Sequence, residues 1–388
     1  VEWLNVGGTA DMVKFIQSEF SRNPSGIGVD MVFGGGVEAH RHLADKALLA
    51  PIALSPKLQA AVPVSFSGMP LRDPQGRWFG AALAGFGILY NKKVFQWLGL
   101  PVPRTWKDLA APALRSWVGS GNPRASGSTH MVYEIILQAY GWNRGYRTLV
   151  RLAANVRSFP RSSAEVPADV TLGEVACGMA LDSYAWNAIG RVGTKRLGYV
   201  LPEGQTVINP DAVSVLKGAP HPRLAKWFVE FVLSREGQAL WMRRPGKSGG
   251  PHRFLLARMS VRPDMYGGDN AVHVNPFTWQ GTHFYDETKA SRRWEVLNTL
   301  MASCLIDSHR ILEKAWKAVI DAGLPAAQVA RLTEPPVSEQ DLSRLAKRWG
   351  TDQVLRSRTS VQWTISCRKR YEAIIRTLGR RSFGGCGG

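Results

Sequence analysis

Strand-like and helix-like segments alternate along the first part of the chain, and glycines stand at the junctions between them. Val1–Val6 and Gly28–Phe33 have the apolar pattern of strands, and Ala10–Phe20 has the periodicity of an amphipathic helix. A second helix is expected from Val37. Strands and helices in this order and at this spacing predict a parallel sheet covered by helices, which is an α/β fold.

The chain is long enough for roughly two to three domains and apolar enough to bury a sizeable core. It has 388 residues, of which 45% are hydrophobic, 10% aromatic and 20% charged. These values exclude a disordered chain, a collagen-like repeat and a small disulfide scaffold. A long run of apolar residues and glycines, Phe79–Tyr90, has 12 residues. A membrane-spanning helix needs about 20, so this run is too short for one.

Positive charge is in excess and gathers toward the C-terminal end. The chain carries 49 Lys and Arg against 30 Asp and Glu, which gives a formal net charge of +19. Ser343–Gly388 alone holds 11 basic and 2 acidic residues. A basic excess favours phosphates, acidic lipids or nucleic acid as partners. A charged, solvated surface is the ordinary explanation of the same excess, and the sequence alone does not exclude it.

The four cysteines are Cys177, Cys304, Cys367 and Cys386. They lie far apart in the sequence and form no CxxC motif, which excludes a zinc ribbon and a dithiol redox motif. One or two disulfides would be compatible with this spacing, and the sequence alone does not decide between the possible pairings.

Three junctions place small residues where a helix is expected to begin: Gly7–Asp11, Gly34–Gly36 and Ser126–Thr129. The backbone N–H groups at a helix N-terminus have no partner within the helix, and the helix dipole favours an anion there. Helix capping is the simpler explanation for each junction taken alone. Together at one sheet edge they would form a ligand site, because ligands of open α/β sheets collect at the carboxyl ends of strands.

No motif predicts catalysis, a cofactor or a metal site. Gly34-x-Gly36-x-x-Ala39 lacks the acidic residue that a dinucleotide site has about 20 positions later. Gly246–Gly250 matches GxSxG around Ser248, but no apolar strand precedes it, so a Ser248 hydrolase is only a distant alternative. The eight histidines do not cluster and no HExxH occurs. We therefore expect a protein without an enzymatic reaction.

The order of segments resembles that of the extracellular solute-binding proteins of ABC importers, in the branch that includes ferric-iron and sugar-phosphate binders. The resemblance covers about residues 1–320 and rests on short segments that are moderately specific together. They are Gly87–Asn91, Gly119–Asn122, Gly127-Ser128, Tyr140–Trp142, Asp182–Ala185, Asn209–Val213 and Lys217–Pro222.

This resemblance implies a two-lobed, class II binding-protein fold with two crossing strands and a ligand cleft that closes by hinge motion. Lobe 1 is expected over residues 1–86 and again over 203–280, lobe 2 over 87–202, and a helical C-terminal region with the basic tail over 281–388. The resemblance also implies a strand and a helix before Val1. The chain begins there without Met, so we infer that its start is missing and that the lack of a signal peptide says nothing of the compartment.

The resemblance also assigns ligand-binding roles. Residues that would hold an anion through backbone N–H groups and hydroxyls are Gly8, Thr9, Gly35, Ser128 and Thr129. Asp182 would accept hydrogen bonds from sugar hydroxyls, with a strand-end cap as the alternative. Tyr184 or Trp186 would stack on the ligand, with core packing as the alternative.

Ferric-iron members of this branch present two adjacent tyrosines as ligands. Here the corresponding residues are Tyr184 and Ala185, so direct iron ligation is not expected. The resemblance predicts a monomeric, periplasmic or extracellular protein that captures a sugar phosphate, organic anion or ferric complex for a membrane permease, without a cofactor and without nucleic acid. The alternative is a nucleic-acid or anionic-surface binder acting through the basic helices from Ser343.

Overall fold

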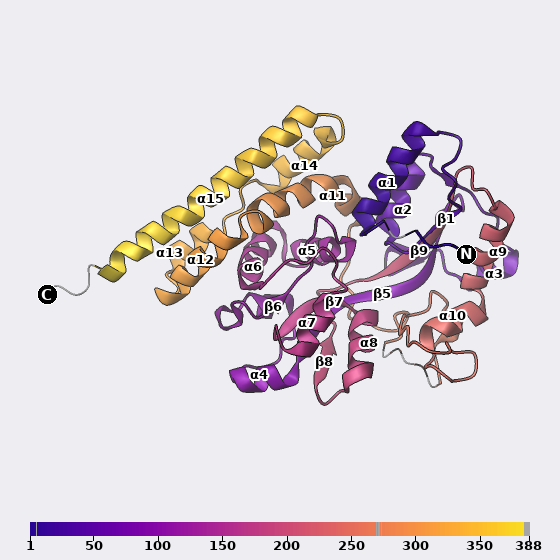
Figure 1. The fold of residues 1–388 in the computed structure, drawn as a ribbon, viewed down its shortest axis with the longest axis horizontal. Helices are drawn as coiled ribbons and strands as arrows, with labels where there is room; N and C mark the ends of the chain where they lie inside the picture. The colour runs from indigo at the N-terminus through magenta and orange to yellow at the C-terminus, as the bar shows by residue number, and fades with distance from the viewer. Residues whose placement is uncertain (5, 269, 271, 273, 384–388) are drawn as a thin grey trace. The chain divides into compact units, whose positions relative to one another are not determined.

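A computed structural model describes residues 1–388 apart from 5, 269, 271, 273 and 384–388. The chain forms two compact units (Figure 1). It changes unit after Gly87, Met179 and Tyr285, and briefly at Ala125–Ser128, whereas lobe boundaries were expected after residues 86, 202 and 280. Unit 1 therefore consists of Val1–Gly87, Ala125–Ser128 and Ala180–Tyr285, and unit 2 of Ile88–Arg124, Thr129–Met179 and Asp286–Gly388.

Unit 1 is built around β9 (Ile208–Leu216). This strand pairs antiparallel with β1 (Met31–Phe33), β2 (Leu49–Ala50) and β5 (Trp78–Asn91). The prediction of a parallel sheet is therefore wrong for unit 1. The strand–helix alternation constrains only consecutive strands, and β9 returns from much later in the chain to pair with all three.

The polar tripeptide Asn209-Pro210-Asp211 lies inside β9 and does not interrupt the strand. β9 continues through all three residues, with Asn209 opposite Ala84 and Pro210 opposite Leu83. Proline removes a single N–H donor from a ladder, and the ladder absorbs the irregularity as a register shift between Gly80 and Ala82 of β5. Asn209 and Asp211, two residues apart, therefore project from the same face of the strand.

Apolar residues cover both faces of this sheet. One core joins Trp78 and Leu216 to Ile16 and Phe20 of α1 (Thr9–Arg22). The other joins Phe79 and Val213 to Val229 and Leu233 of α9 (Pro222–Leu233). Neighbouring residues of a strand point to opposite faces, so helices cover both sides of the sheet.

The remaining elements of unit 1 are short. They are α2 (Val37–Asp45), α3 (Pro56–Ala61), β3 (Ser65–Phe66), β4 (Met69–Pro70), α8 (Asp182–Val192), β8 (Leu197–Val200), α10 (Arg235–Met242) and the 3-10 turn Pro263–Met265. The strand expected over Val1–Val6 is not found: residues 1–4 and 6 form no strand, and Asn5 lies outside the described residues. Val1, Trp3 and Leu4 are exposed, because no described strand pairs with this segment.

Unit 2 contains a parallel pair of strands under a helical layer. β6 (Val118–Gly119) pairs parallel with β7 (Cys177–Leu181). Most of its elements are helices: α4 (Lys92–Leu98), the 3-10 turns Trp106–Ala110 and Pro112–Leu114, α5 (Gly127–Tyr140), α6 (Trp142–Asn155), α7 (Val166–Leu172), α11 (Glu287–Met301), α12 (His309–Asp321), α13 (Ala326–Leu332), α14 (Glu339–Trp349) and α15 (Gln353–Phe383). A π-helical turn, Ala302–Ile306, lies between α11 and α12.

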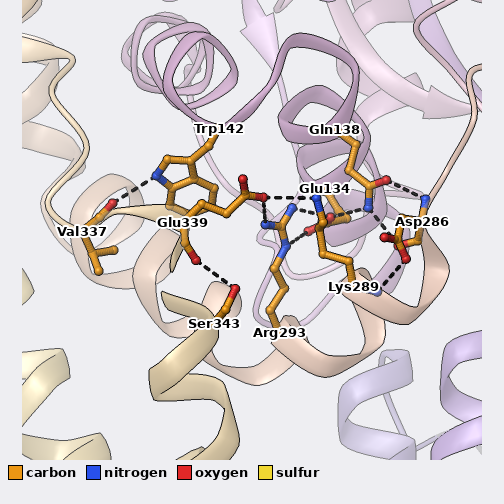
Figure 2. A network of polar contacts seen from close by, with 9 residues as sticks. All are labelled: Glu134, Gln138, Trp142, Asp286, Lys289, Arg293, Val337, Glu339 and Ser343. Carbon is orange, nitrogen blue, oxygen red and sulfur yellow. Dashed lines mark hydrogen bonds and ion pairs between the residues drawn. The ribbon is translucent and has the colours of Figure 1, made fainter. Parts of the chain in front are cut away.

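A buried polar network joins the C-terminal helices to α5 and α6 (Figure 2). Arg293 of α11 donates to both carboxylate oxygens of Glu134, at 2.6 and 3.0 Å, and to Glu339 at 2.8 Å. The indole N–H of Trp142 donates to the carbonyl of Val337 at 3.0 Å. The C-terminal helices thus share one folded body with α5 and α6. In the described part of the chain, no helix is long and apolar enough to cross a membrane.

Candidate functional site

Glycine-rich segments of unit 1 meet around Thr9, at the start of α1. A Cβ atom on Gly127 would lie 3.2 Å from the Thr9 hydroxyl oxygen, and one on Gly35 would lie 3.4 Å from the Thr9 methyl group. A Cβ atom on Gly8, the N-cap of α1, would lie 2.1 Å from the carbonyl oxygen of Ala125. The start of α1, the loop at Gly35 and the segment 125–127 therefore lie so close together that a side chain at one of these glycines would push them apart.

The loop before α2 is held open by its glycines and by a buried histidine. Gly34, Gly35 and Gly36 have φ angles of 90°, 97° and 75°, a region that residues with a Cβ rarely adopt. The imidazole nitrogens of His40 lie 2.8 Å from the Gly34 carbonyl and 2.8 Å from the Ser214 hydroxyl. Burial lowers the pKa of His40 to about 4, so this histidine is neutral and fixes the loop to β9.

Ser128 and Thr129 fall in different units. The Ser128 and Ser126 hydroxyls lie 3.1 Å apart in unit 1. Thr129 belongs to unit 2 and is buried, and a Cβ atom on Gly121 would lie 2.5 Å from its hydroxyl. The proposed contact of Thr129 with a ligand stays a prediction.

Asp182 begins α8, where it is almost fully buried. Its carboxylate accepts hydrogen bonds from the backbone N–H groups of Ser183, at 2.7 Å, and of Gly85. Burial nevertheless raises the pKa of Asp182 to about 7, and the carboxylate of Asp211 adds to this rise, while the Gly85 and Ser183 N–H groups and Arg258 oppose it. Desolvation outweighs the helix start and the hydrogen bonds. A carboxyl that is close to half protonated near neutral pH can both accept and donate to a hydroxyl.

An ion pair faces the same carboxyl group. Arg258 donates to Asp211 of β9, and both side chains are about one-fifth exposed, at 21% and 22%. Burial raises the pKa of Tyr184, the carboxylate of Asp211 raises it further, and Arg258 opposes this. The four side chains of Asp182, Tyr184, Asp211 and Arg258 therefore form one interacting cluster. We call it the Asp182 cluster.

Two buried polar atoms beside this cluster lack hydrogen-bond partners among the described residues. They are the Asn209 side-chain oxygen and the Ser183 hydroxyl. The Asn209 amide nitrogen lies 3.5 Å from Glu38, and a Cβ atom on Gly36 would lie 3.9 Å from it. Asn209 thus connects the glycine loop to the Asp182 cluster. Unpaired buried polar atoms cost about 1–3 kcal/mol each, and such atoms mark places where a ligand or water supplies the missing partner.

Trp186 borders a cavity of about 230 Å³ that is lined by residues of unit 1. Its ring lies 5.9 Å from that of Tyr199, nearly edge to face. The other lining residues are Asp182, Val200, Leu201, Glu203, Ala257, Met259, Val272, Val274 and Trp279. Trp186 and Tyr199 therefore pack against each other and both line the cavity, whereas Tyr184 lies in the charged cluster.

The sequence did not identify Arg258, Asp211, Asn209 or Ser183 as site residues. Asn209 and Asp211 lie in the segment Asn209–Val213, which carried part of the family resemblance, but nothing in the sequence assigned them to the ligand site. Arg258 lies in a segment without periodicity, 47 residues from its partner Asp211, so nothing local pointed to it. Among the described residues, no group of three His, Cys, Asp or Glu side chains could share a metal ion.

The GxSxG match around Ser248 lies in turns that follow α10. The Ser248 carbonyl accepts a hydrogen bond from Arg243, and the residue itself is exposed. No helix begins directly behind it, so the segment lacks the strand–turn–helix geometry of a nucleophile elbow.

Comparison with known proteins gives consistent results. The chain is 23% identical over 320 residues to the phosphoglycerate transport regulatory protein PgtC of Salmonella typhimurium, covering 76% of this chain and 77% of that protein. The periplasmic binding protein AfuA of Actinobacillus pleuropneumoniae, solved with fructose 6-phosphate, has a TM-score of 0.61 at 20% identity, over 82% of this chain and 89% of AfuA. Iron-bound HitA of Pseudomonas aeruginosa has a TM-score of 0.57 at 21% identity, over 75% and 88%.

These likenesses confirm the expected two-lobed binding-protein fold. The profile of a family described as bacterial extracellular solute-binding protein matches residues 27–246, more than half of the chain. Proteins of this family bind solutes for ABC importers and are not enzymes, and the match gives the nucleic-acid alternative no support. The chain belongs to the bacterial extracellular solute-binding proteins.

Proposed function

We propose that this protein captures a sugar phosphate, with the sugar bound by the Asp182 cluster and the phosphate at the start of α1. The observation that carries the proposal is the pair of unpartnered buried atoms, on Asn209 and Ser183, beside that cluster. An amide oxygen, a serine hydroxyl, carboxylates and a guanidinium together match the alternating donors and acceptors of a polyhydroxylated solute. A sugar hydroxyl would supply the partners that these two atoms lack.

The phosphate would occupy the glycine-lined start of α1. Gly8, Thr9 and Gly35 meet there with the segment that ends in Ser128, and a helix N-terminus favours an anion. Asp11 stands in the first turn of α1 and weakens this preference, since its own charge already complements the helix dipole. We therefore expect the sugar contacts to supply much of the affinity, with Trp186 or Tyr184 packing on the ring.

Two relatives support a phosphorylated solute: AfuA was solved with fructose 6-phosphate, and PgtC is named for phosphoglycerate transport. HitA was solved with iron. In this chain Tyr184 is followed by Ala185, which does not supply a pair of adjacent tyrosine ligands. We therefore favour a sugar phosphate over a ferric complex.

On this proposal the protein acts as a monomer in the periplasm or outside the cell, catalyses no reaction and passes its solute to the membrane permease of an ABC importer. Nucleic acid is not a partner. The basic side chains of the C-terminal helices are in part already paired, as in Arg344 with Asp341, Arg348 with Asp352 and Arg376 with Glu372. They are then an exposed, solvated surface.

A thermal-shift screen of the purified chain tests the proposal. The panel is fructose 6-phosphate, glucose 6-phosphate, the two free sugars, 3-phosphoglycerate, inorganic phosphate and ferric citrate. A solute at 100 times its Kd adds about 2.7 kcal/mol of stability, so we expect a hexose phosphate to raise the unfolding midpoint by several degrees. A shift with ferric citrate alone, or with no compound that bears hydroxyls, would contradict the proposal.

Thr9→Val separates the phosphate contact from the sugar contacts. The substitution removes one hydroxyl with little change of volume. It should weaken binding of the hexose phosphate by about tenfold, the size of one charge-assisted hydrogen bond, and leave binding of the free sugar unchanged. The matched control is Thr377→Val in α15, where the hydroxyl donates only to the Ala373 carbonyl.

A further inference from the structure

Two cysteines of unit 2 lie against each other although they are distant in the sequence. Cys304 belongs to the π-helical turn Ala302–Ile306, and Cys367 belongs to α15. Their sulfur atoms are 2.9 Å apart across a sequence separation of 63 residues, and both side chains are fully buried. A disulfide bond is about 2.05 Å long, so the two sulfur atoms are less than an ångström from bonding distance.

Contacts on both sides hold this part of α15 against the π turn. The Tyr371 hydroxyl donates to the Cys304 carbonyl at 3.3 Å, and the Ser303 and Ser360 hydroxyls lie 3.1 Å apart. Arg368, next to Cys367, donates to the Asp307 carbonyl at 2.6 Å. The sulfur atoms therefore face each other because the two backbones are anchored on either side of them, and forming a bond requires only small side-chain rotations.

We propose that Cys304 and Cys367 form a disulfide that fastens α15 to the rest of unit 2. Each thiol loses its proton, one S–S bond forms, and the two electrons reduce the disulfide of an oxidant, such as a protein thiol oxidase or oxidised glutathione, to two thiols. The contact with the Cys304 sulfur, followed by Arg370, lowers the pKa of Cys367, while burial opposes this. Cys367 is thus the better nucleophile of the two.

The disulfide has a defined structural consequence. The segment between the two cysteines contains α12, α13 and α14, which supply most of the contacts of α15. The bond would therefore close a long loop and restrict the unfolded chain. Disulfides persist outside the cytoplasm, so the occurrence of the bond in the cell rests on the proposed location. The reaction of the purified chain depends on neither the proposed location nor the solute.

The first test counts thiols in the full chain. The reduced, unfolded protein is refolded with a mixture of reduced and oxidised glutathione, unfolded again without reductant, alkylated with iodoacetamide and analysed by peptide mass mapping. We expect alkyl groups on Cys177 and Cys386 and a cross-linked peptide pair that contains Cys304 and Cys367. Alkylation of all four cysteines, or a cross-link that joins either residue to Cys177 or Cys386, would overturn the proposal.

The second test measures what the bond does. The thermal midpoint of the oxidised wild-type chain should exceed that of the reduced chain by about 5 °C. The difference should vanish in the Cys304→Ala/Cys367→Ala variant and persist in Cys177→Ala, which removes a buried cysteine of β7 that is not part of the pair. A difference that persists in the double variant would overturn the proposal. If the double variant does not fold, the mass map of the wild-type chain still decides.

Discussion

Each unit contains an arginine that is paired with an acidic side chain, and the two sites differ in how completely their polar groups find partners. In unit 2, Arg293 is 2% exposed and Glu134 is 0% exposed, and the guanidinium contacts Glu134, Glu339 and the ring of Trp142 at 5.5 Å. In unit 1, Arg258 and its partner Asp211 are about one-fifth exposed, at 21% and 22%. The neighbouring Asp182 has a pKa raised by burial, and Asn209 and Ser183 each have a polar atom without a partner among the described residues.

We infer that the difference separates a structural network from the proposed binding site, which is made of the same residue types. A closed network in which every charge is paired holds helices together, and removing one member leaves an uncompensated charge. An open network with unpaired buried atoms lowers the stability of the folded protein. A bound ligand that pairs with these atoms would account for it. The predictions below test this contrast, from the largest expected effect to the smallest.

Arg293→Ala should lower the free energy of unfolding of unit 2 by about 3–5 kcal/mol, because it leaves Glu134 buried without a cation. The measurement is urea denaturation followed by far-UV circular dichroism. Lys289→Ala is the matched control: Lys289 pairs with Glu339 at 3.4 Å in a half-exposed position, and its loss should cost about 1 kcal/mol or less. Equal effects of the two substitutions would show that the network is not structural.

Asp182→Asn should change how stability depends on pH. The pKa of Asp182 rises from 3.8 in the unfolded chain to about 7 in the folded one. The folded state therefore binds the proton more tightly, and its stability falls as pH increases from about 4 to about 7. The asparagine variant lacks this loss, so relative to the wild type it should gain of order 3 kcal/mol between pH 4 and pH 8 without ligand. Parallel curves for the two proteins would contradict the assignment.

Arg258→Met should weaken binding of a hexose phosphate by about tenfold or more, while the free energy of unfolding changes by only about 1 kcal/mol. Isothermal titration calorimetry and urea denaturation on the same preparations give both numbers. Arg235→Met is the control within unit 1, since Arg235 pairs with Asp264 at an exposed position. The two side chains are 62% and 45% exposed. If Arg258→Met lowers the free energy of unfolding but leaves the affinity unchanged, Arg258 has a structural role like that of Arg293.

Asp11→Asn should have the smallest effect. It removes a negative charge from the first turn of α1, where such a charge contributes about 0.3–1 kcal/mol. The affinity for a hexose phosphate should rise about two- to fivefold, and that for the free hexose should stay the same. The ratio of the two dissociation constants, measured by calorimetry at low salt, checks this; an unchanged ratio would place the phosphate elsewhere.

The sequence predicted the α/β fold class from apolar strands and glycine turns, which are local features. It predicted the two-lobed architecture through the family resemblance. It did not predict the antiparallel return of β9, since strand direction depends on which distant segments pair. The junctions at Gly8 and Gly35 were found for the same local reason: a helix start carries its own signal. Arg258 was not, because its role comes only from the carboxylates that the fold brings beside it.

The cysteines show the same limit. Cys304 and Cys367 are separated by 63 residues, and only the packing of α15 on the π turn brings the sulfur atoms together. The π turn itself has no local signal in the sequence, since no proline or glycine marks Ala302–Ile306. Periodicity gives the helices, but the contact between them is a property of tertiary packing.

Hydrogen exchange followed by mass spectrometry, with and without fructose 6-phosphate, tests the contrast between the two sites most directly. Ligand binding stabilises the groups that it contacts. We predict added protection in the peptides that contain Thr9, Asp182 and Asn209, and unchanged exchange around Arg293. Protection confined to the Arg293 network, or absent from all three unit 1 peptides under saturating ligand, would contradict the account.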